Sequence, residues 1–178
     1  SYASFIDNRR LFENEHSRAI SDGIVIFGLE QDDPKKFEHV ISMLSNVANN
    51  LDITLLPVYT NIYLIFRKED AENNFYFWIK QYQGAALAAV AHALHNRLNA
   101  VTIASSLEIS NLTPYGSHPL LDPNFSGYNL KIRHDGIRYS RLEKVKMVTD
   151  YLPAAPRLRV CNQYHKYQPG KLNCGKCE

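Results

Sequence analysis

Short apolar runs alternate with helical patterns along this chain, and that alternation constrains the fold more than any other feature. Residues 23–28, 53–58 and 100–104 are rich in Val, Ile and Leu and have the length and flanking turn residues of buried strands, and 130–133 reads as a further short strand. Strands separated by helices favour a parallel sheet covered on both faces, because parallel neighbours need long crossovers. The sequence therefore predicts an α/β domain over residues 1–152.

Helices are expected before and between these strands. Residues 2–18 carry apolar side chains spaced roughly as one helical face. A second helix is predicted after Asp33, which would be its N-cap, with Pro34 in its first turn. The apolar residues that follow form one stripe at helical spacing. The alanine-rich run 84–95 indicates a buried helix, and 140–148 a further one.

Composition narrows the class of protein. The chain has 178 residues, 45% of them hydrophobic, and a net charge of +2, so charge alone suggests neither a nucleic-acid nor a membrane partner. No apolar run is long enough to span a bilayer, and the first residues do not have the pattern of a signal peptide. We expect a cytoplasmic protein, with its state as monomer or homodimer left open.

Three cysteines lie close together near the end of the sequence. Cys174-Gly-Lys-Cys177 places two thiolates on one side of a tight loop, where tetrahedral Zn²⁺ can take both, and Cys161 can be a third ligand. The fourth ligand would be a further cysteine or His165. Free thiols and a redox dithiol are the alternatives. We expect an irregular zinc knuckle over residues 153–178.

Small or polar residues follow three of the predicted strands. They are Gly28-Leu29, Thr60-Asn61 and Ser105-Ser106. Parallel sheets bind ligands at the carboxyl ends of their strands, so these residues favour a site at that edge.

The densest polar cluster is Gly116-Ser-His-Pro-Leu-Leu-Asp-Pro123. Ser117 and its neighbours can present backbone N–H groups to an anion, and His118 or Asp122 can handle a proton or an ion. The alternative is a proline-bounded loop in which His118 only bonds to backbone. The segment 134–136, His-Asp-Gly, is interpreted as a turn.

Two basic residues share one face of the helix predicted at 140–148. Arg141 and Lys144 are three positions apart, which would let them grip a phosphate, although a solvated face is the usual meaning of this spacing. In the alanine-rich helix, His92 and His95 are interpreted as satisfied core histidines.

Several of these motifs, taken in order, resemble the N-type ATP pyrophosphatase (PP-loop) family, nearest to its cyano-deazaguanine-synthase-like members. The motifs are 116–123, 134–136, 140–144, 159–161 and 173–177. The family's phosphate loop, Ser-Gly-Gly-x-Asp-Ser, does not occur in this sequence; Ser1 resembles only its last residue. The resemblance implies a three-layer sandwich with a parallel sheet, the adenine nucleotide alpha-hydrolase-like (HUP) fold.

The resemblance also implies a reaction. An ATP-dependent enzyme of this kind adenylates a carboxylate or carbonyl oxygen of a small-molecule or peptide acceptor, releases pyrophosphate, and lets a nitrogen nucleophile displace AMP. It implies Mg²⁺ at the phosphates, a structural Zn²⁺, and a catalytic group of Lys144, Arg141 and His118. The residues implied to contact ATP or the substrate are Ser1, Phe27, Gly28, Leu29, Asn61, Gly84, Ser105, Ser106 and Ser117. Two alternatives are a PP-loop tRNA sulfurtransferase and a catalytically inactive, zinc-stabilised nucleotide-binding interaction module.

Overall fold

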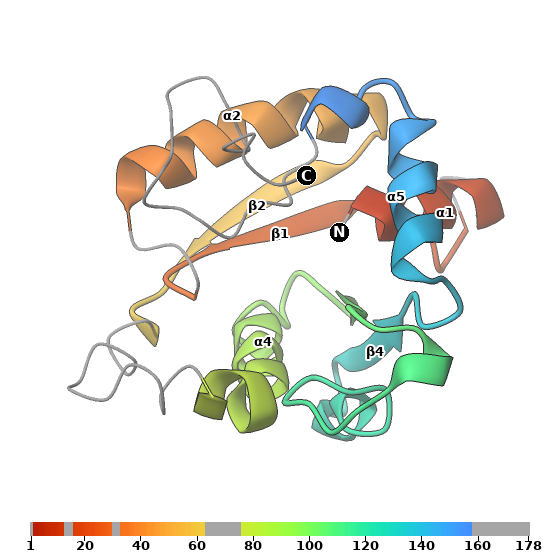
Figure 1. Ribbon diagram of the computed structural model, residues 1–178. Coiled ribbons are helices and arrows are strands. Elements are labelled where there is room, and N and C mark those ends of the chain that lie inside the picture. Colours follow the sequence, from red (N-terminus) through yellow and green to blue (C-terminus); the bar gives the residue numbers. More distant parts are fainter. Residues whose placement is uncertain (1, 13–15, 30–32, 63–75, 158–178) are drawn as a thin grey trace.

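The computed structural model describes residues 2–12, 16–29, 33–62 and 76–157 (Figure 1). Ser1 and the three cysteines of the expected zinc knuckle, Cys161, Cys174 and Cys177, lie outside the described residues.

Four parallel strands form two pairs. β1 (Asp22–Phe27) pairs with β2 (Thr54–Tyr59), and β3 (Ala100–Ala104) pairs with β4 (Lys131–Asp135). Both pairs are parallel, as expected from the alternation of strands and helices, and the α/β class is confirmed. Within the described part of the chain each pair is a two-stranded sheet of its own.

The helices lie between and around the strands. α2 (Pro34–Asn50) connects β1 to β2 and packs along both of them (Figure 1). α1 (Tyr2–Leu11) precedes β1, and α5 (Arg141–Thr149) follows β4. α4 (Gln83–Ala93) follows directly on a π-helical turn, Trp78–Tyr82. Short 3₁₀ turns occupy Ile109–Asn111, Asp122–Phe125 and Ala155–Arg157.

Side-chain N-caps begin two of the helices, α2 and α5. The Asp33 carboxylate accepts hydrogen bonds from Lys35 N at 3.0 Å and Lys36 N at 3.4 Å. Ser140 and Glu143 form a reciprocal capping box at the start of α5. Each cap satisfies backbone N–H groups that have no partner inside the helix, so the predicted start at Pro34 is confirmed.

The core consists of two apolar clusters. One joins α1, the end of α2 and α5, around Ile6, Val47 and Val148. The other joins α4 to β3 and β4, with Ile24 and Leu56 packed against it; its buried members are Ala88, Ala91, Leu98, Ile103, Leu130 and Ile132. The expectation that every strand is buried on both faces is wrong for β2, none of whose residues is buried.

A buried carboxylate fastens α1 to the segment in front of α5. Asp7 is 6% exposed and accepts hydrogen bonds from the Arg138 guanidinium and, at 2.7 Å, from the Tyr139 hydroxyl. The charge of Asp7 is therefore paired where the two helices meet, which is the condition for burying it.

Two local interpretations need correction. His134 and Asp135 are the last residues of β4, and only Gly136, with φ of +85°, takes the turn conformation. Ladder hydrogen bonds extend the strand two residues further than the apolar pattern indicated. His92 is partly buried and bonded to Phe125 O at 2.7 Å, but His95 is exposed beyond the end of α4. No helix among the described residues is long and apolar enough to cross a membrane.

Candidate functional site

Lys144 lies at the carboxyl ends of β3 and β4. Its Nζ donates a hydrogen bond to the carbonyl oxygen of Ser105 at 3.1 Å. Ser105 N in turn donates to Asp135 O at 2.7 Å, so this edge is closed by a backbone bond just beyond the strands. A side chain on Gly136 would stand 3.7 Å from Lys144 Cε, which shows that the lysine stem passes over this turn. The structure thus brings two of the predicted site residues, Lys144 and Ser105, into contact.

The surroundings of Lys144 act on its charge in opposite directions. Burial lowers its pKa below the ordinary lysine value, while the negative charges of Glu108 and Asp135 raise it, and burial prevails. An ammonium has three donors, and among the described residues Ser105 O uses one of them. Two donors are then left for an anionic partner. Lys144 is therefore a cation at the edge of the sheet, near two carboxylates, with N–H groups that can donate to a ligand.

The carboxyl ends of β1 and β2 meet at Gly28. Its φ is +87°, and a Cβ there would stand 2.1 Å from Thr60 O, so only glycine fits. Thr60 donates to Phe27 O from both its backbone N, at 3.0 Å, and its hydroxyl, at 2.9 Å. The glycine predicted to contact a nucleotide is thus also required by the backbone.

The aromatic ring of Phe27 is packed among other rings. Its centroid lies 5.4 Å from that of Phe37 and 5.7 Å from that of Tyr59. Phe27 is 9% exposed and Tyr59 is 65% exposed. Among the described residues at this edge, Tyr59 therefore has an accessible aromatic surface on which a base could stack; it lies two residues before the predicted Asn61.

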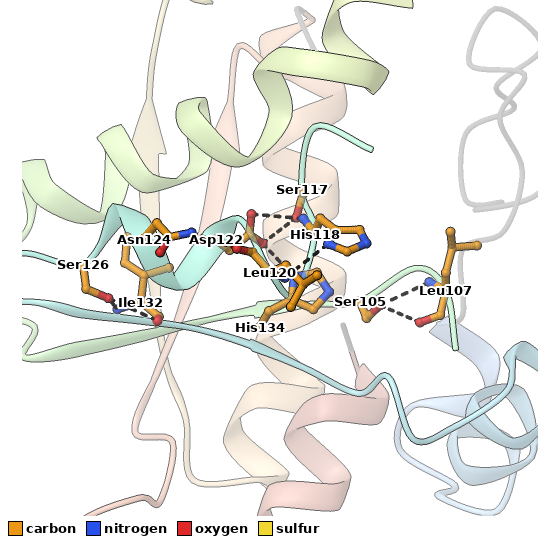
Figure 2. Close-up of polar contacts among 10 residues, drawn as sticks. All are labelled: Ser105, Leu107, Ser117, His118, Leu120, Asp122, Asn124, Ser126, Ile132 and His134. Atoms are coloured by element: carbon orange, nitrogen blue, oxygen red, sulfur yellow. Dashed lines mark hydrogen bonds and ion pairs between the residues drawn. The ribbon is translucent and has the colours of Figure 1, made fainter. Parts of the chain in front are cut away.

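A buried carboxylate organises the polar loop. Asp122 is fully buried and accepts hydrogen bonds from Ser117 Oγ at 2.7 Å, His118 N at 3.2 Å and His134 Nδ1 at 2.6 Å (Figure 2). A Cβ on Gly84 would stand 2.5 Å from Asp122 Oδ1, so α4 packs directly on this network. Three predicted site residues, Gly84, Ser117 and His118, are brought together here.

Within this network the predicted groups have structural partners. The Ser117 hydroxyl donates to Asp122, and His118 Nδ1 accepts from Leu120 N at 3.2 Å, as in the alternative in which His118 bonds to backbone. Gly84 is buried, and its N–H donates to Gly116 O at 2.7 Å. The close packing of Gly84 accounts for a glycine there without a ligand.

His134 was missed as a partner of this network. Its side chain is 3% exposed, and its Nε2 has no hydrogen-bond partner in the described part of the chain. Since Nδ1 faces the Asp122 carboxylate, Nδ1 carries the proton. The signal in the sequence was a histidine directly after an apolar strand; its distance of twelve residues from Asp122 gave no hint of the pairing.

The other predicted site residues lie on the surface or just beyond the strands. Arg141 is exposed at the first position of α5, and Ser106 is exposed just beyond β3. Leu29 and Asn61 follow β1 and β2. The described residues contain no group of three or more metal-binding side chains.

No family model matches this sequence, and neither a curated protein nor a solved structure is significantly similar to it. Any assignment of function therefore depends on the geometry of the site together with the sequence motifs.

Proposed function

We propose that this protein is an ATP-dependent adenylating enzyme whose site lies along the carboxyl ends of its parallel strands. The observation that carries the proposal is the position of Lys144, a partly desolvated cation bonded to Ser105 O at the end of β3. Parallel sheets bind ligands at this edge, and a positive charge with unused donors suits a phosphate chain. The resemblance of the sequence motifs to PP-loop proteins supports the same assignment.

The proposed reaction has two steps. An oxygen of the acceptor attacks the α-phosphorus of ATP, and the bond from that phosphorus to the bridging oxygen breaks, releasing pyrophosphate. A nitrogen nucleophile then attacks the adenylated carbon, and AMP leaves. Lys144 offsets the negative charge that grows on the leaving pyrophosphate, and Arg141, one helical turn before it, assists.

The carboxylates near Lys144 fit a role in metal binding. The negative charges of Glu108 and Asp135 both raise the pKa of Lys144. Mg²⁺ in nucleotide sites is held by one or two carboxylates together with phosphate oxygens. When bound, Mg²⁺ would neutralise phosphate charge. We propose in addition that the complete fold is a three-layer HUP-like sandwich and that Cys161, Cys174 and Cys177 hold a structural Zn²⁺.

A binding measurement tests the role of Lys144 without knowledge of the acceptor. We expect Mg·ATP to bind the wild-type protein in isothermal titration calorimetry and Lys144→Met to weaken binding by about tenfold or more, the scale of one charge-assisted contact. Lys146→Met is the matched control, because Lys146 is an exposed residue of the same helix. Equal affinity of the Lys144→Met and wild-type proteins would contradict the assigned role.

Product and metal analysis separate the alternatives. Release of AMP and pyrophosphate in equal amounts, with ammonium and a panel of carboxylic acids, supports the adenylating enzyme. ATP binding without turnover on any acceptor favours the interaction module. Iron with labile sulfide, in place of tightly held zinc, favours the tRNA sulfurtransferase.

A further inference from the structure

A cavity of about 640 Å³ separates β1 from β3. One wall consists of alternate residues of β1, namely Asp22, Ile24 and Ile26, and the opposite wall of the whole of β3. The helices α1 and α4 also contribute, through Phe5 and Leu87 among others. The cavity therefore lies between the two sheets and is bounded by one edge strand from each.

Hydrogen bonds at both ends of β3 show which of its backbone groups face the cavity. Asn99 O accepts from Lys131 N at 2.9 Å, and Ser105 N donates to Asp135 O at 2.7 Å. Successive residues of a strand point their N–H and C=O groups to opposite sides, so residues 101 and 103 also face β4. Ala100, Thr102 and Ala104 consequently point their backbone groups away from β4, toward the cavity.

The same argument applies to β1. Thr54 N donates to Ser21 O at 2.8 Å, and Thr60 N donates to Phe27 O at 3.0 Å. The odd-numbered residues of β1 therefore face β2, and residues 22, 24 and 26 face the other way. These are the β1 residues that line the cavity.

Neither cavity-facing edge is paired within the part of the chain that the structure describes. There β1 pairs with β2 alone, and β3 pairs with β4 alone. An ion pair between Asp22 Oδ1 and Arg97 Nη2, at 2.7 Å, ties the start of β1 to the segment just before β3. Unpaired edges are templates for another strand, and here two of them border one cavity.

We propose that this cavity binds a β-strand of polypeptide from outside residues 1–178, running parallel to β1 and β3. Such a strand would continue both established ladders and join the two pairs into one sheet. The lining is mixed. Ile24, Ile26 and Ile103 favour uncharged, β-branched residues in the strand, as in parallel strands buried on both faces, and Asp22, Arg97 and Arg133 leave room for polar residues as well. Its length follows from its neighbours, since β1 has 6 residues and β3 has 5.

The position of α1 indicates how this strand is connected. Ser4 and Phe5 of α1 line the cavity, and α1 leads into β1. A strand joined to the amino end of α1 and lying beside β1 forms a β–α–β unit, the ordinary connection between adjacent parallel strands. The proposed occupant is therefore a strand attached in front of α1.

Amide hydrogen exchange followed by NMR tests the proposal. In the 178-residue protein we expect the amides of Ile24, Ile26, Thr102 and Ala104 to exchange at least about tenfold faster than those of Val25 and Ile103, which face the paired strands. In a fusion that places Val-Val-Val-Leu-Val and a Gly-Ser linker before Ser1, the four cavity-facing amides should become protected by about tenfold or more.

Two controls make the outcome specific. Val-Pro-Val-Pro-Val in the same fusion lacks alternate N–H donors and should give no protection. Thr102→Pro removes one cavity-facing donor while leaving the β3–β4 ladder intact, and should weaken protection by the Val-rich fusion. The proposal is overturned if Ile24 and Thr102 exchange as slowly as Val25 and Ile103 without the added strand. It is also overturned if the Val-rich fusion leaves their rates unchanged.

Discussion

Replacing Asp122 by alanine tests the account of the polar loop most directly. The carboxylate has no solvent exposure and accepts from three donors, on Ser117, His118 and His134. Alanine removes all three bonds and leaves His134, whose side chain is 3% exposed, without a partner at either ring nitrogen among the described residues. The network joins the loop, β4 and α4, so its loss should act on global stability.

The magnitude follows from which donors water can reach. A buried donor left unsatisfied costs about 1–3 kcal/mol, and each hydrogen bond exchanged for one to water costs about 0.5–1.5 kcal/mol. Ser117 and the His118 N–H are only partly buried and can be rehydrated, so the His134 term dominates. We expect Asp122→Ala to lower the free energy of unfolding by about 2–4 kcal/mol. Asp122→Asn should cost about 1–2 kcal/mol, because the amide can donate to Nδ1 once His134 carries its proton on Nε2.

Urea unfolding measures both values. The single tryptophan, Trp78, is 6% exposed and lies in the helical turn before α4, so its fluorescence reports on this layer. Asp135→Asn is the control, since Asp135 is exposed and adjacent to His134; it should change stability by less than about 0.5 kcal/mol. A loss below about 1 kcal/mol for Asp122→Ala, with an unchanged denaturant slope, would refute the argument.

Three further predictions concern backbone and charge. Gly28→Ala should destabilise by about 2–3 kcal/mol in the same assay, because φ is +87° and the new Cβ would meet Thr60 O; a loss within error would contradict this conformation. Ser140→Ala should lower the free energy of unfolding by about 1 kcal/mol through loss of the α5 cap. The Ser140 hydrogen bonds lower the pKa of Glu143, so the difference in stability between wild type and variant should shrink as the pH falls through that lowered pKa. Burial lowers the pKa of Lys144 below its ordinary value of 10.5, so between the two pKa values the unfolded chain binds more protons than the folded one. The stability of the wild type relative to Lys144→Met should therefore rise with pH across this window. A difference that does not change with pH would exclude burial as the cause of the lowered pKa.

Much of the fold was predictable because its determinants are local. Asp33 and Pro34 specify where α2 begins through contacts within the first turn, and the alanine-rich run specifies α4 through helix propensity and an apolar surface. The exposure of β2 was not predictable. An apolar run shows that burial would be favourable, but which neighbours cover it depends on tertiary packing.

The site was less predictable because its contacts join distant segments. The contact of Lys144 with Ser105 spans 39 residues, and only the family resemblance pointed to Lys144 in preference to other lysines. His134 was assigned to a turn because Asp-Gly is a strong turn signal, while its bond to Asp122 exists only once the loop has folded over β4. Spacing along the chain carries no information about such a pair.

The Asp7 cluster has a consequence for folding during synthesis. Its partners Arg138 and Tyr139 lie 131 and 132 residues further along the chain. At about 5–20 residues per second, a ribosome needs roughly 7 to 26 s to make that stretch. A helix of 10 residues is marginal by itself in water. The end of α2 can cover part of the apolar face of α1 early, but the residues of α5 in the same cluster arrive only after that interval. The contacts of α1 are thus completed only after α5 has been made, and until then part of its apolar face is open to aggregation.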